Sequence, residues 1–183
     1  MDDLVKKAMA KWPNVPDCYG WLGLDARGRW FMRDDASQQA GEFACGNARA
    51  KGSELRHEKL IDFIGRNYLS DDFGQWYFQN GPQRVFVELE ITPWIWRIEQ
   101  DFSIQSHTGE NADFEQGFVD EVGRVFVKTS LGIGLVHSQD VQRVAEAIDT
   151  LQWTFVETSY ASLKQQFAFV PSPSQYHLYE KSR

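Results

Sequence analysis

The chain has 183 residues and a net charge of −7; it is 42% hydrophobic and 25% charged, and it contains two cysteines. These values are ordinary for a globular protein and exclude a collagen-like, a disulfide-framework or an intrinsically disordered chain. The excess of acidic residues disfavours a nucleic-acid partner, because phosphates are bound mainly through Lys and Arg. No stretch approaches the ~20 apolar residues that span a bilayer, and the acidic start Met1-Asp2-Asp3 differs from the basic start of a signal peptide. We expect a cytoplasmic protein with no membrane partner.

Local patterns in the first half predict helices alternating with a hairpin. Apolar residues at spacings of three and four indicate a first helix, which Pro13 ends. The segment Asp25-Ala-Arg-Gly28 is typical of a tight turn. Ser53 is the expected N-cap of a second amphipathic helix. In chain order, we predict a helix over 2–12, a hairpin of 19–25 with 29–33, a surface loop over 34–52 and a helix beginning after Ser53.

The second half is richer in strand patterns. Asn80-Gly81 is a strong hairpin signal, and Pro93 precedes an apolar run that we interpret as an adjacent or edge strand. Residues 98–123 contain seven acids and no Lys or Arg, which indicates a solvated connection at their centre. We predict a hairpin of 71–80 with 83–92, a strand over 94–98, a hairpin of 117–120 with 124–129, a flexible connection at 130–134, a helix starting at Ser138 or Asp140, a short strand within 152–157, a helix over 159–167 and a mobile polar tail after Pro171.

A short motif occurs three times, as Asp25-Ala-Arg-Gly28, Asp71-Asp-Phe-Gly74 and Asp120-Glu-Val-Gly123, each followed by a polar residue and two or more apolar ones. The spacing suits a repeated unit of hairpin and helix, although three unrelated Asp/Gly hairpins would give the same pattern. In either case the sequence predicts an α+β fold of antiparallel hairpins interleaved with helices. We expect two subdomains, residues 1–69 and residues 70–183.

Several motifs together resemble a known family. They are Leu24-Asp-Ala-Arg-Gly-Arg-Trp-Phe, Leu55-Arg-His-Glu-Lys-Leu-Ile, Asp72-Phe-Gly-Gln-Trp-Tyr-Phe, Val85-Phe-Val-Glu-Leu-Glu and Thr92-Pro-Trp94. Their order is similar to that in a bacterial family of uncharacterised proteins, known as a domain of unknown function. The resemblance implies two α+β subdomains built from repeated hairpin-helix motifs and a role in signal transduction. It implies no catalytic residues.

The motifs that could carry chemistry are weak. His57 and His137 each precede a predicted helix and lie beside acids or hydroxyls, so a His/carboxylate pair is one interpretation. Their second interpretation is local backbone bonding at a helix start. The acids around His107 match no defined calcium or zinc spacing, and no nucleotide or nucleophile motif is present. We therefore predict no catalytic residue, metal or cofactor.

The aromatic residues make up 14% of the chain and include seven Trp, which suggests either core packing or a binding surface. Our leading hypothesis is a non-enzymatic module that binds a small ligand or a protein partner in regulation or signal transduction. Two alternatives remain: an unrecognised hydrolase or metal-dependent enzyme using His57 or His137, and a homodimer joined through an aromatic strand edge. The candidate binding residues are Trp76, Phe78, Trp94, Trp96, His57 and His137.

Overall fold

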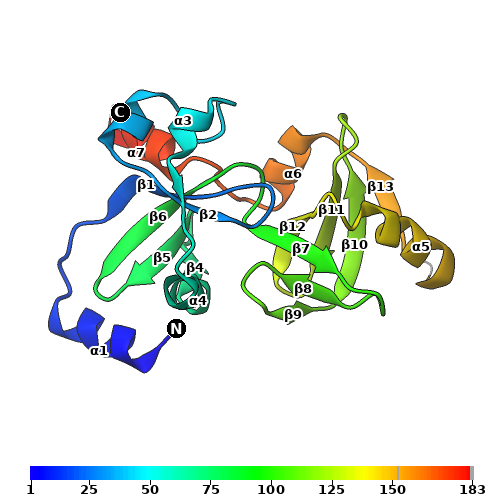
Figure 1. The fold of residues 1–183 in the computed structure, drawn as a ribbon, viewed down its shortest axis with the longest axis horizontal. Helices are drawn as coiled ribbons and strands as arrows, with labels where there is room; N and C mark the ends of the chain where they lie inside the picture. The colour runs from blue at the N-terminus through cyan, green and yellow to red at the C-terminus, as the bar shows by residue number, and fades with distance from the viewer. Residues whose placement is uncertain (152, 182–183) are drawn as a thin grey trace. The chain divides into compact units, whose positions relative to one another are not determined.

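The computed structural model describes residues 1–151 and 153–181, which form two compact units. Unit 1 comprises Met1–Asp25, Arg29–Ile91 and Phe169–Arg183, and unit 2 comprises Ala26–Gly28 and Thr92–Ala168. The fold is α+β, as predicted (Figure 1). The predicted boundary between residues 69 and 70 lies inside unit 1, within the hairpin where Ser70 pairs with Trp76 and antiparallel pairing ties its two sides together.

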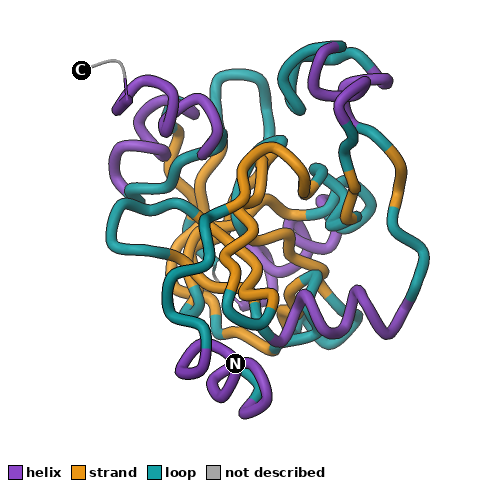
Figure 2. The backbone as a smooth tube through the Cα atoms, turned by 90° about the vertical axis from the view of Figure 1, so that its left-hand side faces the viewer, coloured by secondary structure: helices purple, strands orange, loops and turns teal. Residues whose placement is uncertain are grey.

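Unit 1 is built on a six-stranded sheet with the order β3-β2-β1-β6-β5-β4, in which only β1 and β6 run parallel. Its strands appear orange and its helices purple in Figure 2. Its elements are α1 (Asp3–Lys11), β1 (Cys18–Leu24), β2 (Trp30–Met32), α2 (Asp35–Gln39), α3 (Ala48–Lys51), β3 (Ser53–Glu54), α4 (Glu58–Arg66), β4 (Tyr68–Ser70), β5 (Trp76–Asn80), β6 (Gln83–Leu89) and α7 (Pro173–Lys181).

Unit 2 has a seven-stranded sheet with the order β13-β10-β11-β12-β7-β8-β9. Two of its pairings are parallel, β12 with β7 and β10 with β13. Its elements are β7 (Trp94–Ile98), β8 (Ile104–Ser106), β9 (Asn111–Ala112), β10 (Phe114–Val119), β11 (Val125–Thr129), β12 (Gly132–Val136), α5 (Val141–Leu151), β13 (Phe155–Glu157) and α6 (Tyr160–Gln166).

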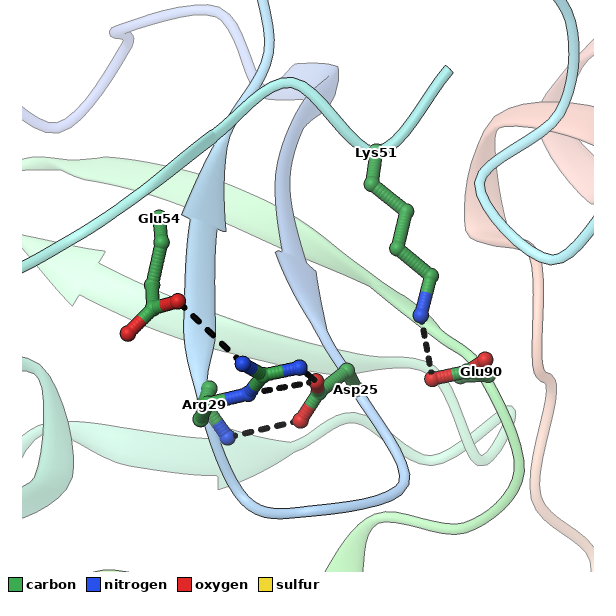
Figure 3. Close-up of polar contacts among 5 residues, drawn as sticks. All are labelled: Asp25, Arg29, Lys51, Glu54 and Glu90. Atoms are coloured by element: carbon green, nitrogen blue, oxygen red, sulfur yellow. Dashed lines mark hydrogen bonds and ion pairs between the residues drawn. The ribbon is translucent and has the colours of Figure 1, made fainter. Parts of the chain in front are cut away.

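The repeated Asp/Gly motif folds into the same turn at each of its three positions. In each, the Asp Oδ1 accepts the backbone N–H four residues later, and the side chain at that later position donates to Oδ2. The glycine one residue earlier has a positive φ, which only glycine adopts without strain. Figure 3 shows the first turn, where Arg29 donates to Asp25 and also reaches Glu54. The motif therefore encodes a specific local structure.

A fourth turn of this kind escaped the sequence analysis. Ser106 Oγ accepts the N–H groups of Thr108 and Glu110, and Gly109 again has a positive φ. A hydroxyl here takes the place of the carboxylate, so the Asp/Gly pattern does not reveal it. With this turn, the hairpin β8–β9 lies within the acidic segment that we had predicted to be a solvated connection, and that prediction was wrong.

Three other local predictions were also wrong. Residues 34–52 contain the helices α2 and α3, because Asp34 and Asn47 accept backbone N–H groups as N-caps. Ser53 lies in β3, and the N-cap of α4 is His57. Residues 132–136 form strand β12 rather than a flexible connection.

The segment after Pro171 is the helix α7 rather than a mobile tail. Glu88 holds its start in place, since its carboxylate accepts from Ser172 Oγ at 2.6 Å and from the Ser174 N–H at 3.0 Å. A carboxylate at a helix N-terminus also interacts favourably with the helix dipole. Residue 152, in the predicted strand 152–157, lies outside the described residues; β13 occupies the end of that range.

Candidate functional site

A cavity of about 290 Å³ lies in unit 1 between the sheet and the chain leading into α4. Two rows of cross-strand neighbours form its sheet side. Cys18, Val85 and Phe78 are paired across β1, β6 and β5, and Leu22 is paired with Met32 across β1 and β2. The full lining consists of Cys18, Trp21, Leu22, Met32, Leu55, Leu60, Ile64, Phe78, Asn80 and Val85.

A bulge in β1 brings two consecutive side chains, Trp21 and Leu22, to the cavity. Along the parallel pair, β1 advances from Cys18 to Leu22 while β6 advances only from Val85 to Val87. Gly20, with φ of +81°, lies in this irregular segment. Regular strand alternation would place Trp21 and Leu22 on opposite faces, so the bulge is what redirects the indole.

The opposite wall is supplied by α4 and the residues before it. His57 Nδ1 accepts the Leu60 N–H at 3.2 Å and so fixes the first turn of this helix. Leu60 and Ile64, one turn apart, line the cavity, and Phe63 packs edge-to-face on Phe78 with ring centroids 5.4 Å apart. The apolar stripe predicted for this helix therefore bounds the cavity.

The chemistry of the lining is apolar and uncharged. Asn80 carries a polar amide and Trp21 an indole N–H, and the other lining side chains consist of carbon and sulfur groups. Burial raises the pKa of the Cys18 thiol, so it stays protonated at neutral pH and behaves as a small apolar group. Trp21 and Met32 keep 41% and 51% of their surface exposed, and together they mark the opening of the cavity to solvent.

Larger hollows elsewhere have a different character. One of about 400 Å³ in unit 2 includes Ser103, Asn111 and Asp113, and one of about 480 Å³ in unit 1 includes Asp34 and Arg49. Their linings mix polar and charged groups with apolar ones. Specific binding of a small molecule favours a mostly apolar lining with few polar groups, which is the character of the cavity beside α4.

The predicted site residues of unit 1 lie in and beside this cavity. Phe78 lines it, and Trp76 lies two residues earlier on the same strand, where its ring packs against Tyr68 with centroids 4.7 Å apart. His57 lies outside the cavity and caps α4. Trp21, Leu22 and Met32 were not predicted as lining residues. The signal available for them was Gly20, which interrupts the alternation in β1.

Trp94 and Trp96, the two predicted Trp residues of the site in unit 2, do not form a sheet edge. β7 lies between β12 and β8, so the predicted edge position is wrong, and the sheet edges are β13 and β9. Trp94 and Trp96 are 5% and 0% exposed, and their rings stack with centroids 5.7 Å apart. Their indole N–H groups donate to the backbone oxygens of Leu131 and Val127. Both side chains therefore belong to the core of unit 2.

His137, the other predicted site residue, makes the local contact expected at a helix start. Its Nδ1 accepts the Gln139 N–H at 3.3 Å. Nearby, the buried Asp140 accepts from Arg97 and from Arg143, the latter at 2.9 Å, and this joins the start of α5 to β7. Burial is the largest single influence on Asp140 and opposes its ionisation, but the hydrogen bonds from Arg97 and the Ile98 N–H and the charges of Arg97 and Arg143 together outweigh it and lower the pKa of the carboxyl. These contacts give this cluster a structural role.

The described part of the chain lacks a metal-binding cluster and a membrane-spanning helix. Among residues 1–151 and 153–181, no group of three or more His, Cys, Asp or Glu side chains is arranged to hold a metal ion. Within the same residues, no helix is both long enough and apolar enough to cross a membrane.

Comparison with known proteins places the sequence in a family. The family model described as "Protein of unknown function (DUF2946)" matches residues 1–177. The chain belongs to this family. The match confirms that the chain is a member of an unknown-function family, as the sequence motifs indicated. No curated protein matches the chain.

Two solved structures are similar to the chain. A DUF1285 family protein from Silicibacter pomeroyi DSS-3 has 12% sequence identity and a TM-score of 0.49, with 80% of this chain and 84% of that chain covered. A DUF1285 family protein from Shewanella baltica OS155 has 14% identity and a TM-score of 0.44, with coverage of 69% and 91%.

Proposed function

We propose that the protein is a non-enzymatic binding module whose unit 1 takes up a small apolar molecule in the cavity beside α4. The observation that carries this proposal is the uncharged cavity of about 290 Å³, which opens between the exposed side chains of Trp21 and Met32. Its volume is at the lower end of the range for small-molecule sites, ~300–1,000 Å³. A role in regulation or signal transduction rests on the family resemblance alone.

The absence of charge in the lining selects the chemistry of the ligand. Moving a charged group into such a site would leave it without a partner, which is costly, whereas each buried methylene contributes ~0.8 kcal/mol. Asn80 offers one amide for a single polar group. A short alkyl chain or a small aromatic ring bearing one hydroxyl fits these constraints.

Calorimetric titration with n-alcohols from butanol to decanol tests this proposal. We expect affinity to rise roughly fourfold with each added methylene, and then to level off once the cavity is filled. A lack of measurable binding, or affinity that is independent of chain length, would refute the proposal.

A cavity-filling variant locates the binding. Val85→Phe adds a ring between Cys18 and Phe78 and should abolish alcohol binding while the circular dichroism spectrum stays unchanged. The matched control is Val156→Phe, which makes the same change at a half-exposed strand position of unit 2. Unchanged binding by Val85→Phe, or equal loss in both variants, would count against the cavity as the site.

A further inference from the structure

A second, smaller cavity of unit 1 has a very different lining. It has a volume of about 180 Å³ and lies between α7 and residues of β1 and of the turn before β5. Its lining consists of Tyr19, Phe73, Gln75, Tyr176, His177 and Glu180. Four of these six side chains carry aromatic rings, one is a carboxylate, and none is Lys or Arg. Tyr19 and His177 stack with ring centroids 4.2 Å apart, which connects the sheet wall to the helix wall.

Gln75 presents an unsatisfied acceptor at this cavity. The side chain is only 6% exposed, and its Nε2 donates to Asp71 Oδ2 at 3.0 Å. A carboxylate oxygen can only accept, so this bond fixes which end of the amide is the oxygen. Within residues 1–151 and 153–181, Oε1 of Gln75 is buried and has no hydrogen-bond partner. Buried polar atoms are seldom left unpaired, because each such atom costs ~1–3 kcal/mol.

Comparison with the other Asp/Gly turns shows that this acceptor is particular to one of them. The equivalent position holds Arg29 in the first turn and Arg124 in the third, and both donate to the Asp carboxylate as Gln75 does. A guanidinium has donors only, so an Arg here would satisfy the turn and leave no acceptor. Gln75 preserves the contact within the turn and adds a buried acceptor oxygen that the turn itself does not satisfy.

The electrostatics around the cavity favour a cation. Burial raises the pKa of Tyr19, and the charges of Asp17 and Asp71 raise it further against the opposing charge of Arg84. The phenol therefore remains neutral, and its ring is stacked between those of Phe86 and His177. Glu180 supplies a carboxylate in the lining, which also includes the exposed ring of Phe73.

We propose that this cavity binds a primary ammonium group carried on a short alkyl chain. An N–H of the ammonium donates to Gln75 Oε1 and satisfies the buried acceptor. The positive charge lies against the aromatic rings, with the Glu180 carboxylate as its counter-charge. This site is separate from the apolar cavity beside α4, whose lining shares none of its residues.

Three probes of similar size distinguish the contribution of the positive charge from that of the N–H donor. The probes are n-butylammonium, n-butanol, which lacks the charge, and tetramethylammonium, which has the charge but no N–H donor. Binding is followed through the imidazole proton resonances of His177, assigned with a His177→Gln variant, so that a probe entering the cavity beside α4 is not counted. We expect n-butylammonium to bind at least tenfold more tightly than either of the other two. Equal binding of n-butanol or of tetramethylammonium would overturn the proposal.

A turn-preserving variant tests the acceptor itself. Gln75→Arg installs the residue found in the equivalent turns, so the turn should form while the acceptor is replaced by a positive charge. We expect it to weaken n-butylammonium binding at least tenfold. Glu180→Gln, at an exposed position, should weaken it severalfold, and it provides the test should Gln75→Arg fail to fold. Trp21→Ala, in the other cavity, should leave the affinity unchanged. Unaltered affinity in a folded Gln75→Arg variant, or in Glu180→Gln, would contradict the proposal.

Discussion

The two units use similar elements but fill the space beside their central parallel strands in opposite ways. In unit 2, the parallel pair β12 and β7 sets Gly134 beside Trp94. The two stacked indoles occupy the space that Gly132 and Gly134 leave. In unit 1, the parallel pair β1 and β6 presents Cys18 and Val85. These side chains are much smaller than indoles, and a cavity remains beside α4. The volume of the side chains on this strand pair therefore decides whether the space beside the sheet is filled or left as a cavity.

Removing one indole from each unit should give the largest difference in the free energy of unfolding. Trp96 is fully buried and donates to the Val127 oxygen at 2.8 Å, so Trp96→Ala should reduce the free energy of unfolding by ~3–5 kcal/mol. Trp21 is 41% exposed at the cavity opening, so Trp21→Ala should cost no more than ~1–2 kcal/mol and should weaken alcohol binding instead. Urea unfolding of both variants measures the difference. Equal losses would show that the indoles have the same role.

A methyl group added to unit 2 should produce the next largest effect. A Cβ at Gly134 would lie 2.3 Å from Trp96 Nε1 and 2.7 Å from the Trp94 backbone oxygen. Gly134→Ala should therefore destabilise the protein by ~1–3 kcal/mol through overpacking. Adding Trp96→Phe should recover part of the loss, because the smaller ring relieves the closer contact. A fully stable Gly134→Ala variant would contradict the packing described for unit 2.

The pH dependence of stability should have opposite signs in the two units. Burial raises the pKa of Glu88 in unit 1, whereas in unit 2 the hydrogen bonds and charges around Asp140 together outweigh burial and lower the pKa of that carboxyl. A raised folded pKa means that stability falls as pH rises above the unfolded value near 4.5 and through the folded pKa. A lowered folded pKa means that stability falls as pH drops below the unfolded value near 3.8 and through the folded pKa.

Two neutral variants separate these contributions. Glu88→Gln should remove the loss of stability on going to higher pH, and Asp140→Asn should remove the loss on going to lower pH. Thermal unfolding between pH 3 and 7 would show both effects as changes in slope. Changes of the same sign in both variants would contradict the assignment.

The sequence predicted those elements whose signals are local. The Asp/Gly turns and the amphipathic helices over 2–12, 159–167 and after His137 follow from residue identity and spacing, and the structure contains them. Predictions failed where contacts between residues far apart in the sequence determine the structure. Pro93 suggested an edge strand, but pairing with β12 and β8 places Trp94 and Trp96 in the interior. The tail after Pro171 is helical because Glu88, some 84 residues earlier, binds its start.

The candidate site was predictable only in part, for the same reason. Phe78 was recognised as a candidate because aromatic residues gather in its strand. The cavity itself depends on a bulge between β1 and β6, and these strands are far apart in sequence. No local pattern reports which side chains such a bulge will bring together. The orphaned oxygen of Gln75 could have been suspected by comparing the residues that follow the three Asp/Gly turns.

The most direct test of the account is protection of Cys18 by a bound apolar ligand. Cys45 is exposed, and in a Cys45→Ser background Cys18 is the single thiol, so its rate of modification by iodoacetamide at alkaline pH reports on the cavity. We expect saturating n-hexanol to slow this reaction at least tenfold in the Cys45→Ser protein, with no further slowing when Val85→Phe fills the cavity. An unchanged rate in the presence of the alcohol would show that apolar ligands do not enter unit 1 beside α4.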